Sequence, residues 1–166
     1  MNQNNLIIKE ACVETVKEAI LAEKQGADRI ELCYRLEYDG LTPAKNIIKK
    51  SIKSLSIPIK VMIRPRKGNF IYNEKEIMEM ESKIEMCKNI GITEVVFGLL
   101  KSDKNIDYIS TERLVKKAYP MSVTFHKAID ITSDILNSIE KLVPISGIAS
   151  ILSSGGEKTA YHGKER

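Results

Sequence analysis

The stretch IKVMIRP, residues 59–65, decides between the two common folds that are built on parallel strands. Its side chains alternate between an apolar and a mixed set: Ile59, Val61 and Ile63 against Lys60, Met62 and Arg64. Successive side chains of a strand point to opposite faces, so one face of this strand is apolar. A central strand of an open doubly wound sheet is apolar on both faces, whereas a barrel strand turns one face to helices and one to the lumen. The stretch therefore favours a barrel, with Arg64 facing the lumen.

Short β-branched runs of this kind alternate along the chain with segments that have the period of an amphipathic helix. The runs predict strands at 5–12, 28–33, 59–65, 93–100, 121–126 and 147–154. The longer segments predict helices at 13–25, 44–55, 74–90, 111–119 and 131–143. Such alternation indicates parallel strands joined by crossover helices. No glycine-rich dinucleotide or phosphate loop follows the first strand. The sequence predicts an α/β fold of the (β/α)8 TIM-barrel type.

The length of the chain does not suffice for a closed barrel of this type. Eight βα units need about 250 residues, whereas the chain has 166 and shows six strands. We therefore expect one domain over residues 1–166, a TIM-barrel-like domain truncated at its C-terminal end. An incomplete barrel exposes edge strands, which proteins usually cover. Either a second copy covers these edges as a homodimer, or the chain is a fragment with no activity of its own.

Composition and charge exclude several classes of protein. Lys and Arg number 26 and Asp and Glu 22, which gives a formal net charge of +4, and the charges are spread along amphipathic segments rather than clustered. This distribution argues against nucleic acid as a partner. No apolar run approaches the roughly 20 residues that cross a bilayer, and no signal segment opens the chain. Three cysteines, an odd number, indicate reduced thiols. We expect a cytoplasmic protein without a membrane partner.

Five ordered motifs resemble the CutC family, which is named for copper homeostasis. They are GADRIELC (26–33), DGLTP (39–43), VMIRPRKGNFIYNEKEI (61–77), SVTFHKAID (122–130) and ILSSGG (151–156). The resemblance covers essentially the whole chain and implies a (β/α)8 barrel of which strands seven and eight are absent here. Departures within the motifs are mild; Asn69 stands where the family usually has aspartate, which puts any role of that position as a base or metal ligand in doubt.

Two cysteines end the first two strands, each in a Glu-x-Cys triplet: Glu10 to Cys12 and Glu31 to Cys33. Neighbouring strands lie about 4.8 Å apart, so the thiols of Cys12 and Cys33 could meet at the C-terminal mouth of the barrel. Thiolates are soft ligands that select Cu(I), and the resemblance implies copper binding at these positions. A buried cysteine also serves as a small apolar side chain. We interpret Cys87, on the apolar stripe of its helix, in that way.

His126 ends the fifth strand, where the active sites of TIM barrels gather. An imidazole there suits acid/base catalysis because its ordinary pKa is about 6.5. Asp130 could accept a hydrogen bond from the ring or cap a helix that begins near Ile131. We expect His126 and Asp130 to form the catalytic group with Glu31, although a single histidine is often only structural.

Arg64 and Arg66 allow three interpretations. They could clamp an anionic substrate, since guanidinium groups bind carboxylate and phosphate bidentately; they could pair with lumen glutamates; or they could lie at a solvated strand end. We expect Glu10 at the same mouth as part of the substrate site, Arg64 paired with a lumen glutamate, and Arg66 nearer the rim. Phe70 and Tyr72 would cover the mouth or pack on it.

Two functions of different classes follow. The resemblance implies a cytosolic protein of copper homeostasis that binds Cu(I) through Cys12 and Cys33. The ring of Glu, Arg and His at the mouth favours instead a barrel enzyme that acts on a small carboxylate or phosphate.

Overall fold

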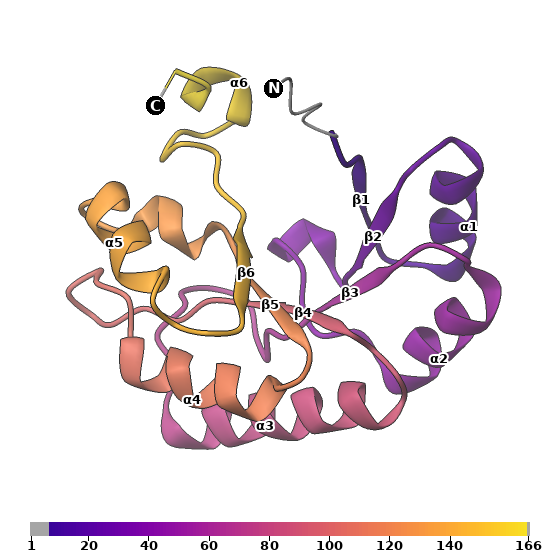
Figure 1. Ribbon diagram of the computed structural model, residues 1–166, viewed down its shortest axis with the longest axis horizontal. Coiled ribbons are helices and arrows are strands. Elements are labelled where there is room, and N and C mark those ends of the chain that lie inside the picture. Colours follow the sequence, from indigo (N-terminus) through magenta and orange to yellow (C-terminus); the bar gives the residue numbers. More distant parts are fainter. Residues whose placement is uncertain (1–6, 166) are drawn as a thin grey trace, which may run out of the picture.

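The computed structural model describes residues 7–165 and consists of one curved, six-stranded parallel sheet with the strand order β1-β2-β3-β4-β5-β6 (Figure 1). The strands are β1 (Glu10–Val13), β2 (Arg29–Leu32), β3 (Ile59–Met62), β4 (Glu94–Phe97), β5 (Ser122–Phe125) and β6 (Ile148–Ile151). The helices are α1 (Val16–Lys24), α2 (Lys45–Ser54), α3 (Glu74–Asn89), α4 (Tyr108–Ala118), α5 (Ile135–Leu142) and α6 (Ala160–Gly163). Six parallel strands that alternate with helices confirm the predicted α/β fold of the TIM-barrel type, incomplete as expected.

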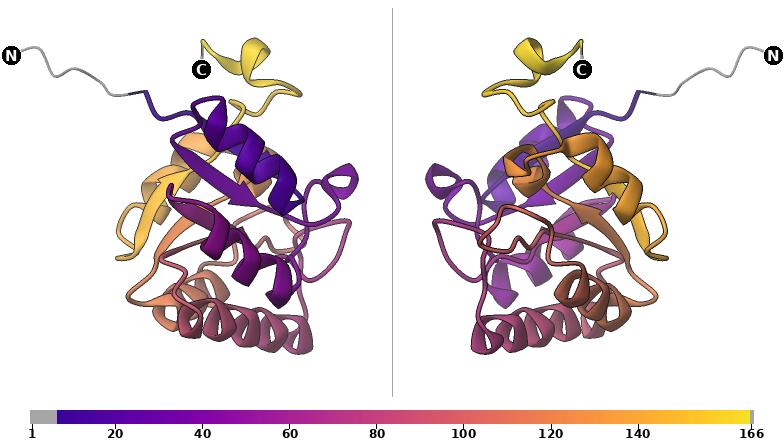
Figure 2. Two further views of the ribbon diagram at one scale, coloured as in Figure 1. Left: turned by 90° about the vertical axis from the view of Figure 1, so that its right-hand side faces the viewer. Right: turned by 90° about the vertical axis from the view of Figure 1, so that its left-hand side faces the viewer.

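Helices α1 to α5 lie on the outer face of the sheet, with α1 next to β1 and β2 and α5 near β6, whereas α6 lies beyond the end of β6 (Figure 1 and Figure 2). The core between them is apolar and includes Ile30, Leu32, Val61, Ile63, Val95 and Val123 on the sheet side and Ala19, Ile48, Ile77, Met80, Ile84 and Leu114 on the helix side. Burial of each Val, Leu, Ile or Met side chain in this set stabilises the fold by about 1.5–3 kcal/mol. The alternation predicted for residues 59–63 is confirmed, because Val61 and Ile63 pack in this core.

The inner face carries the mixed set of side chains. Lys60 is buried and its Nζ donates to Thr124 Oγ1 at 2.7 Å. Met62 packs with Cys33 and Val96 in a small apolar cluster of its own. The inner face thus carries polar and apolar side chains together, and they alternate with the apolar outer face as along a barrel strand.

Several element boundaries differ from the prediction, among them the start of the first strand and the start of the fifth helix. The first strand was expected from residue 5, whereas β1 begins at Glu10; residues 5 and 6 lie outside the described part of the chain. A helix was expected from Ile131, but residues Lys127–Ile131 form a 3-10 helix and α5 begins at Ile135. The reason is capping: the side chain of Asp134 accepts from Asn137 N at 3.0 Å, which fixes the helix start there.

The sheet is not closed. Among residues 7–165, β1 pairs only with β2 and β6 only with β5, so both strands are free edges in this part of the chain. Across residues 7–165 no helix combines the length and apolar character that crossing a membrane needs.

Candidate functional site

Three side chains converge at the C-terminal ends of β1 and β2. The Sγ atoms of Cys12 and Cys33 are 3.6 Å apart. Glu31 Oε1 lies 3.5 Å from the sulfur of Cys12 and 3.6 Å from that of Cys33. Within residues 7–165 these three form the one group of Cys, His, Asp and Glu side chains that is compact enough to hold a metal ion. The predicted meeting of the two thiols is present, and the strand register produces it, because Cys12 pairs with Glu31 and Cys33 follows β2.

Burial and neighbouring groups disfavour the ionised forms of Glu31 and Cys33. The pKa of Glu31 is raised by burial and by the nearby Glu10 carboxylate. The pKa of the Cys33 thiol is raised well above its usual range by its hydrogen bond with Cys12 and by burial. A positive ion bound between these groups would favour their ionised forms instead, since metal ligands bind in their deprotonated form.

The turn after β2 packs directly on Cys33. Gly40 has a φ of +81°, and a Cβ there would lie 3.0 Å from the Cys33 sulfur. Arg35 and Asp39 also have left-handed backbones, with φ of 53° and 62°. Only a glycine accepts both the conformation and the contact at position 40, so this turn holds the thiol in place.

A pocket of about 670 Å³ lies over the C-terminal ends of the strands. Cys12 and Glu31 line it together with His126 and Asp130. Its remaining lining is both apolar and charged: Leu36, Asp39, Met62, Phe70, Lys127, Ile131, Leu152, Ser154, Gly156, Glu157 and Lys158. The structure therefore brings four of the predicted site residues to one pocket.

His126 is a neutral, buried histidine. Its Nδ1 accepts from Ala128 N at 3.2 Å, whereas its Nε2 is buried and has no hydrogen-bond partner within residues 7–165. Burial and the positive charge of Arg64 lower the pKa of His126 to about 3. The ring also excludes any side chain at Gly98, where a Cβ would lie 2.6 Å from Nδ1. Sequence reasoning missed Gly98, although it directly follows the apolar run of β4.

Asp130 has a different role from the two that were expected. Its carboxylate accepts from Ser153 Oγ at 2.6 Å, from Ser154 N at 2.9 Å and Oγ at 3.0 Å, and from Gly156 N at 3.0 Å. These bonds shape the loop after β6. The expectations that Asp130 binds the His126 ring or caps a helix near Ile131 are therefore wrong. Its catalytic role stays a prediction.

The expectation that Arg64 pairs with a lumen glutamate is also wrong. One amino group, Nη1, donates to the carbonyl oxygens of Tyr38 at 2.5 Å and Gly40 at 3.1 Å. The other, Nη2, donates to Gly68 O at 2.8 Å, and the guanidinium lies 4.8 Å from the ring centroid of Phe70. Arg64 is 2% exposed and ties the turn after β2 to the loop after β3 through its two amino groups, whereas its Nε has no hydrogen-bond partner within residues 7–165.

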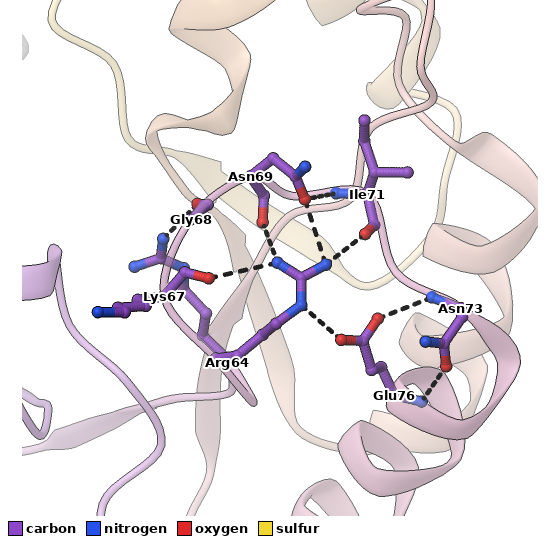
Figure 3. A network of polar contacts seen from close by, with 8 residues as sticks. Arg64, Lys67, Gly68, Asn69, Ile71, Asn73 and Glu76 are labelled. Carbon is purple, nitrogen blue, oxygen red and sulfur yellow. Dashed lines mark hydrogen bonds and ion pairs between the residues drawn. The ribbon is translucent and has the colours of Figure 1, made fainter.

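Arg66 organises the loop between β3 and α3 (Figure 3). It donates to Glu76 Oε1 at 2.5 Å, to Asn69 Oδ1 at 3.2 Å and to three main-chain oxygens, those of residues 67, 69 and 71. Glu76 also closes a capping box with Asn73, the N-cap of α3. Arg66 lies nearer the rim, as expected, with a side chain 36% exposed. Anion binding by Arg64 and Arg66 stays a prediction, and both guanidinium groups already have protein partners.

Glu10 lies at the opposite end of the strands from the pocket. It begins β1, and its carboxylate pairs with Arg29 and with Lys60 Nζ at 3.3 Å. The expectation that Glu10 reaches the C-terminal mouth is wrong, because the strand runs away from it toward Cys12. Sequence reasoning missed Lys60 as a cation that pairs with Glu10. Alternation could have shown it, since Lys60 has the parity of Arg64.

Solved structures with this arrangement of strands include a CutC protein. The crystal structure of CutC from Streptococcus agalactiae superposes with a TM-score of 0.86 at 34% sequence identity, over 92% of this chain and 75% of that one. Phosphoenolpyruvate phosphomutase from Streptomyces platensis subsp. rosaceus superposes with a TM-score of 0.66 at 13% identity, over 97% of this chain and 65% of that one. The second likeness concerns the fold alone.

Sequence relatives agree with the first likeness. The family protein CutC of Histophilus somni is 39% identical over 155 residues, which cover 93% of this chain and 63% of that protein. The human copper homeostasis protein cutC homolog is 39% identical over 159 residues, which cover 96% of this chain and 58% of that protein. The chain thus spans about three fifths of the length of these relatives. The model of the CutC family matches residues 7–166, and the chain belongs to the CutC family.

Proposed function

We propose that this chain binds Cu(I) in the cytoplasm through the thiolates of Cys12 and Cys33 and serves copper homeostasis. The observation that carries the proposal is the pair of sulfur atoms 3.6 Å apart at the mouth of the pocket. Metal–thiolate bonds are about 2.3 Å long, so one ion reaches both sulfurs with little movement. Relatives named for copper homeostasis, such as the human protein, support the choice of metal.

The donor set favours a soft ion. Two thiolates select Cu(I) over the hard cations Mg²⁺ and Ca²⁺, which take oxygen ligands. Glu31 supplies a carboxylate within the same 4.8 Å group, and this harder donor would also accommodate Zn²⁺. Competition between Cu(I) and Zn²⁺ is therefore part of the test.

The experiment titrates the anaerobic protein with Cu(I) against a chromogenic Cu(I) chelator and repeats the titration with Zn²⁺. We expect the double variant Cys12→Ser and Cys33→Ser to bind Cu(I) at least about a hundredfold more weakly than the natural protein, because loss of a group that merely hydrogen-bonds a metal ligand already costs roughly 10- to 100-fold in affinity. Cys87→Ala is the matched control, since Cys87 lies buried on α3 away from the pocket.

Two outcomes would contradict the proposal. One is an unchanged Cu(I) affinity in the double variant. The other is a natural protein that prefers Zn²⁺ at equal free concentrations of the two ions.

A further inference from the structure

We propose that the pocket over the strand ends has a second occupant, a small organic carboxylate that accepts a hydrogen bond from His126 Nε2. The inference goes beyond copper binding. It starts from a buried side chain that neither the fold nor the thiol site explains: His126 is 4% exposed and lines the pocket, and its Nε2 has no partner within the described chain.

The hydrogen bond at the other ring nitrogen identifies Nε2 as a donor. Nδ1 accepts from Ala128 N at 3.2 Å, so it carries no proton. In a neutral imidazole the proton then resides on Nε2. A buried N–H donor without a partner destabilises a fold, and an acceptor oxygen supplied by a ligand removes that penalty.

The surroundings keep the ring in one orientation. Gly98 leaves no room for a Cβ beside Nδ1. The ring of Phe70 packs on the imidazole with 4.7 Å between centroids, and Phe125 packs against it edge-on at 6.1 Å. Such a preorganised donor resembles a binding site more than a gap in the core.

The charge nearest to this donor favours an anion. The guanidinium of Arg64 lies over the Phe70 ring, and this ring packs on His126 with its plane tilted by 55°, so a cation lies close to both rings. Lys127 and Lys158 line the same pocket, and so do Asp39 and Glu157. Glu31 and Asp130 line it too, so the pocket as a whole holds four carboxyl groups and two lysines. Arg64 is nevertheless the charge that acts on the ring itself, because it helps to lower the pKa of His126. Its field favours an anionic oxygen at Nε2.

The loop after β6 argues for a carboxylate rather than a phosphate. A phosphate site needs several main-chain N–H groups that point at one anion. In this loop Ser154 N and Gly156 N donate to Asp130, and Gly155 N donates to Ser153 Oγ. The internal carboxylate of Asp130 thus occupies the place that a phosphate would take.

Phe70 controls access to the donor. Both Phe70 and His126 line the pocket, but Nε2 itself is closed off from solvent. A ligand reaches Nε2 when the phenyl ring of Phe70 moves aside. Removal of this ring should therefore leave carboxylate binding intact or strengthen it, whereas loss of Nε2 should abolish it.

The test measures binding of lactate, pyruvate, succinate and inorganic phosphate to the intact protein by calorimetry and by the ¹⁵N shift of His126 Nε2. We expect at least one of the three carboxylates to bind and to move that signal. His126→Asn keeps an acceptor for Ala128 N but lacks the Nε2 donor, and it should weaken binding at least tenfold. Phe70→Ala should bind at least as well as the natural protein. His162→Asn, at an exposed histidine on α6, is the control.

Three results would overturn the inference: no binding by any of the three carboxylates, equal binding to His126→Asn, or stronger binding of phosphate than of each carboxylate. If His126→Asn does not fold, the natural protein alone provides the test. An Nε2 signal that does not move at saturating carboxylate then overturns the inference. The variant with Cys12→Ser and Cys33→Ser should still bind the carboxylate, so the two proposals fail separately.

Discussion

At the residue scale, burial of His126 makes stability depend on pH. Its pKa is about 3 in the folded protein and about 6.5 in an unfolded chain. Between these values the unfolded chain binds the extra proton, so the free energy of unfolding falls as the pH falls from about 6.5 toward 3. Above pH 6.5 the contribution is fully present. From pH 7 to pH 5 we expect a loss of about 2 kcal/mol from this group alone, measured by urea unfolding.

The control for this prediction is the difference between variants. His126→Asn has no ring to titrate, so its unfolding free energy should lose about 2 kcal/mol less over the same interval. His162→Asn should follow the natural protein. Parallel curves for the natural protein and His126→Asn would show that the buried ring does not control the pH dependence.

The contact between Gly98 and the His126 ring leads to a steric prediction. A Cβ at Gly98 would lie 2.6 Å from Nδ1 and 3.1 Å from the ring of Phe125. Gly98→Ala must push the imidazole away and break its bond with Ala128 N. We expect a loss of about 1–3 kcal/mol in stability, together with a change in the His126 imidazole signals by NMR.

Gly91 offers a matched comparison. A Cβ there meets nothing within 4 Å, but the φ is +90°, so Gly91→Ala should cost about 1 kcal/mol through backbone strain alone. In Gly91→Ala the NMR signals of the His126 imidazole should not move. If Gly98→Ala also leaves these signals in place, the packing of the ring against Gly98 is not as described.

The alternation of side chains along a strand predicts some of the observed contacts between single residues but not others. The approach of Cys12, Glu31 and Cys33 follows from strand parity, because neighbouring parallel strands put equal parity on one face. The hydrogen-bond partners of Arg64 and Asp130 do not follow from strand parity. Both side chains bind main-chain groups of loops, and these loops depend on left-handed residues such as Asp39, which no periodic pattern marks.

At the scale of elements, the loop from β3 to α3 depends on one guanidinium. Arg66 has planar donors that reach Glu76, Asn69 and three main-chain oxygens. A lysine has at most three donors on one nitrogen and cannot span this set. We expect Arg66→Lys to lower the protection of loop amides 67–72 against hydrogen exchange by about 1 kcal/mol, with the core strands unchanged.

Arg113→Lys is the control for the loop. Arg113 also makes a bidentate contact from α4 to α3, through Glu81, and a further one to Glu74. This exposed contact lies outside the loop, so its loss should leave amides 67–72 protected as before. Equal exchange in the natural protein and Arg66→Lys would contradict the role of Arg66 in ordering the loop.

The order and type of the main elements followed from hydrophobic periodicity, whereas their ends did not. Each predicted strand overlaps an observed one, and the predicted helix at 74–90 agrees with α3 to within one residue. The start of α5 was missed because Ile131 continues the apolar pattern. Asp134 interrupts that pattern with a cap, and local capping outweighs a weak helical period.

At the scale of the whole molecule, the sheet has two free edges that face the open side of the lumen. β1 and β6 each pair on one side only. Apolar side chains lie beside both edges, since Ile7 and Ile8 are 84% and 51% exposed and Leu152 is 38% exposed. Unpaired strand edges with apolar neighbours favour association. We therefore predict that the chain forms a homodimer through these edges, measurable as a concentration-dependent mass in sedimentation velocity.

A charge on the edge strand tests this prediction. Ala149 is exposed on β6, and Ala149→Lys places an ammonium group where a second copy would pair, which should raise the dimer dissociation constant at least about tenfold. Ser54→Lys adds the same charge at the exposed end of α2, away from both edges, and should leave the dissociation constant unchanged. A monomer at every concentration would refute edge pairing. Equal weakening by both substitutions would assign the association to net charge, because only pairing at the edge makes the position of the lysine matter.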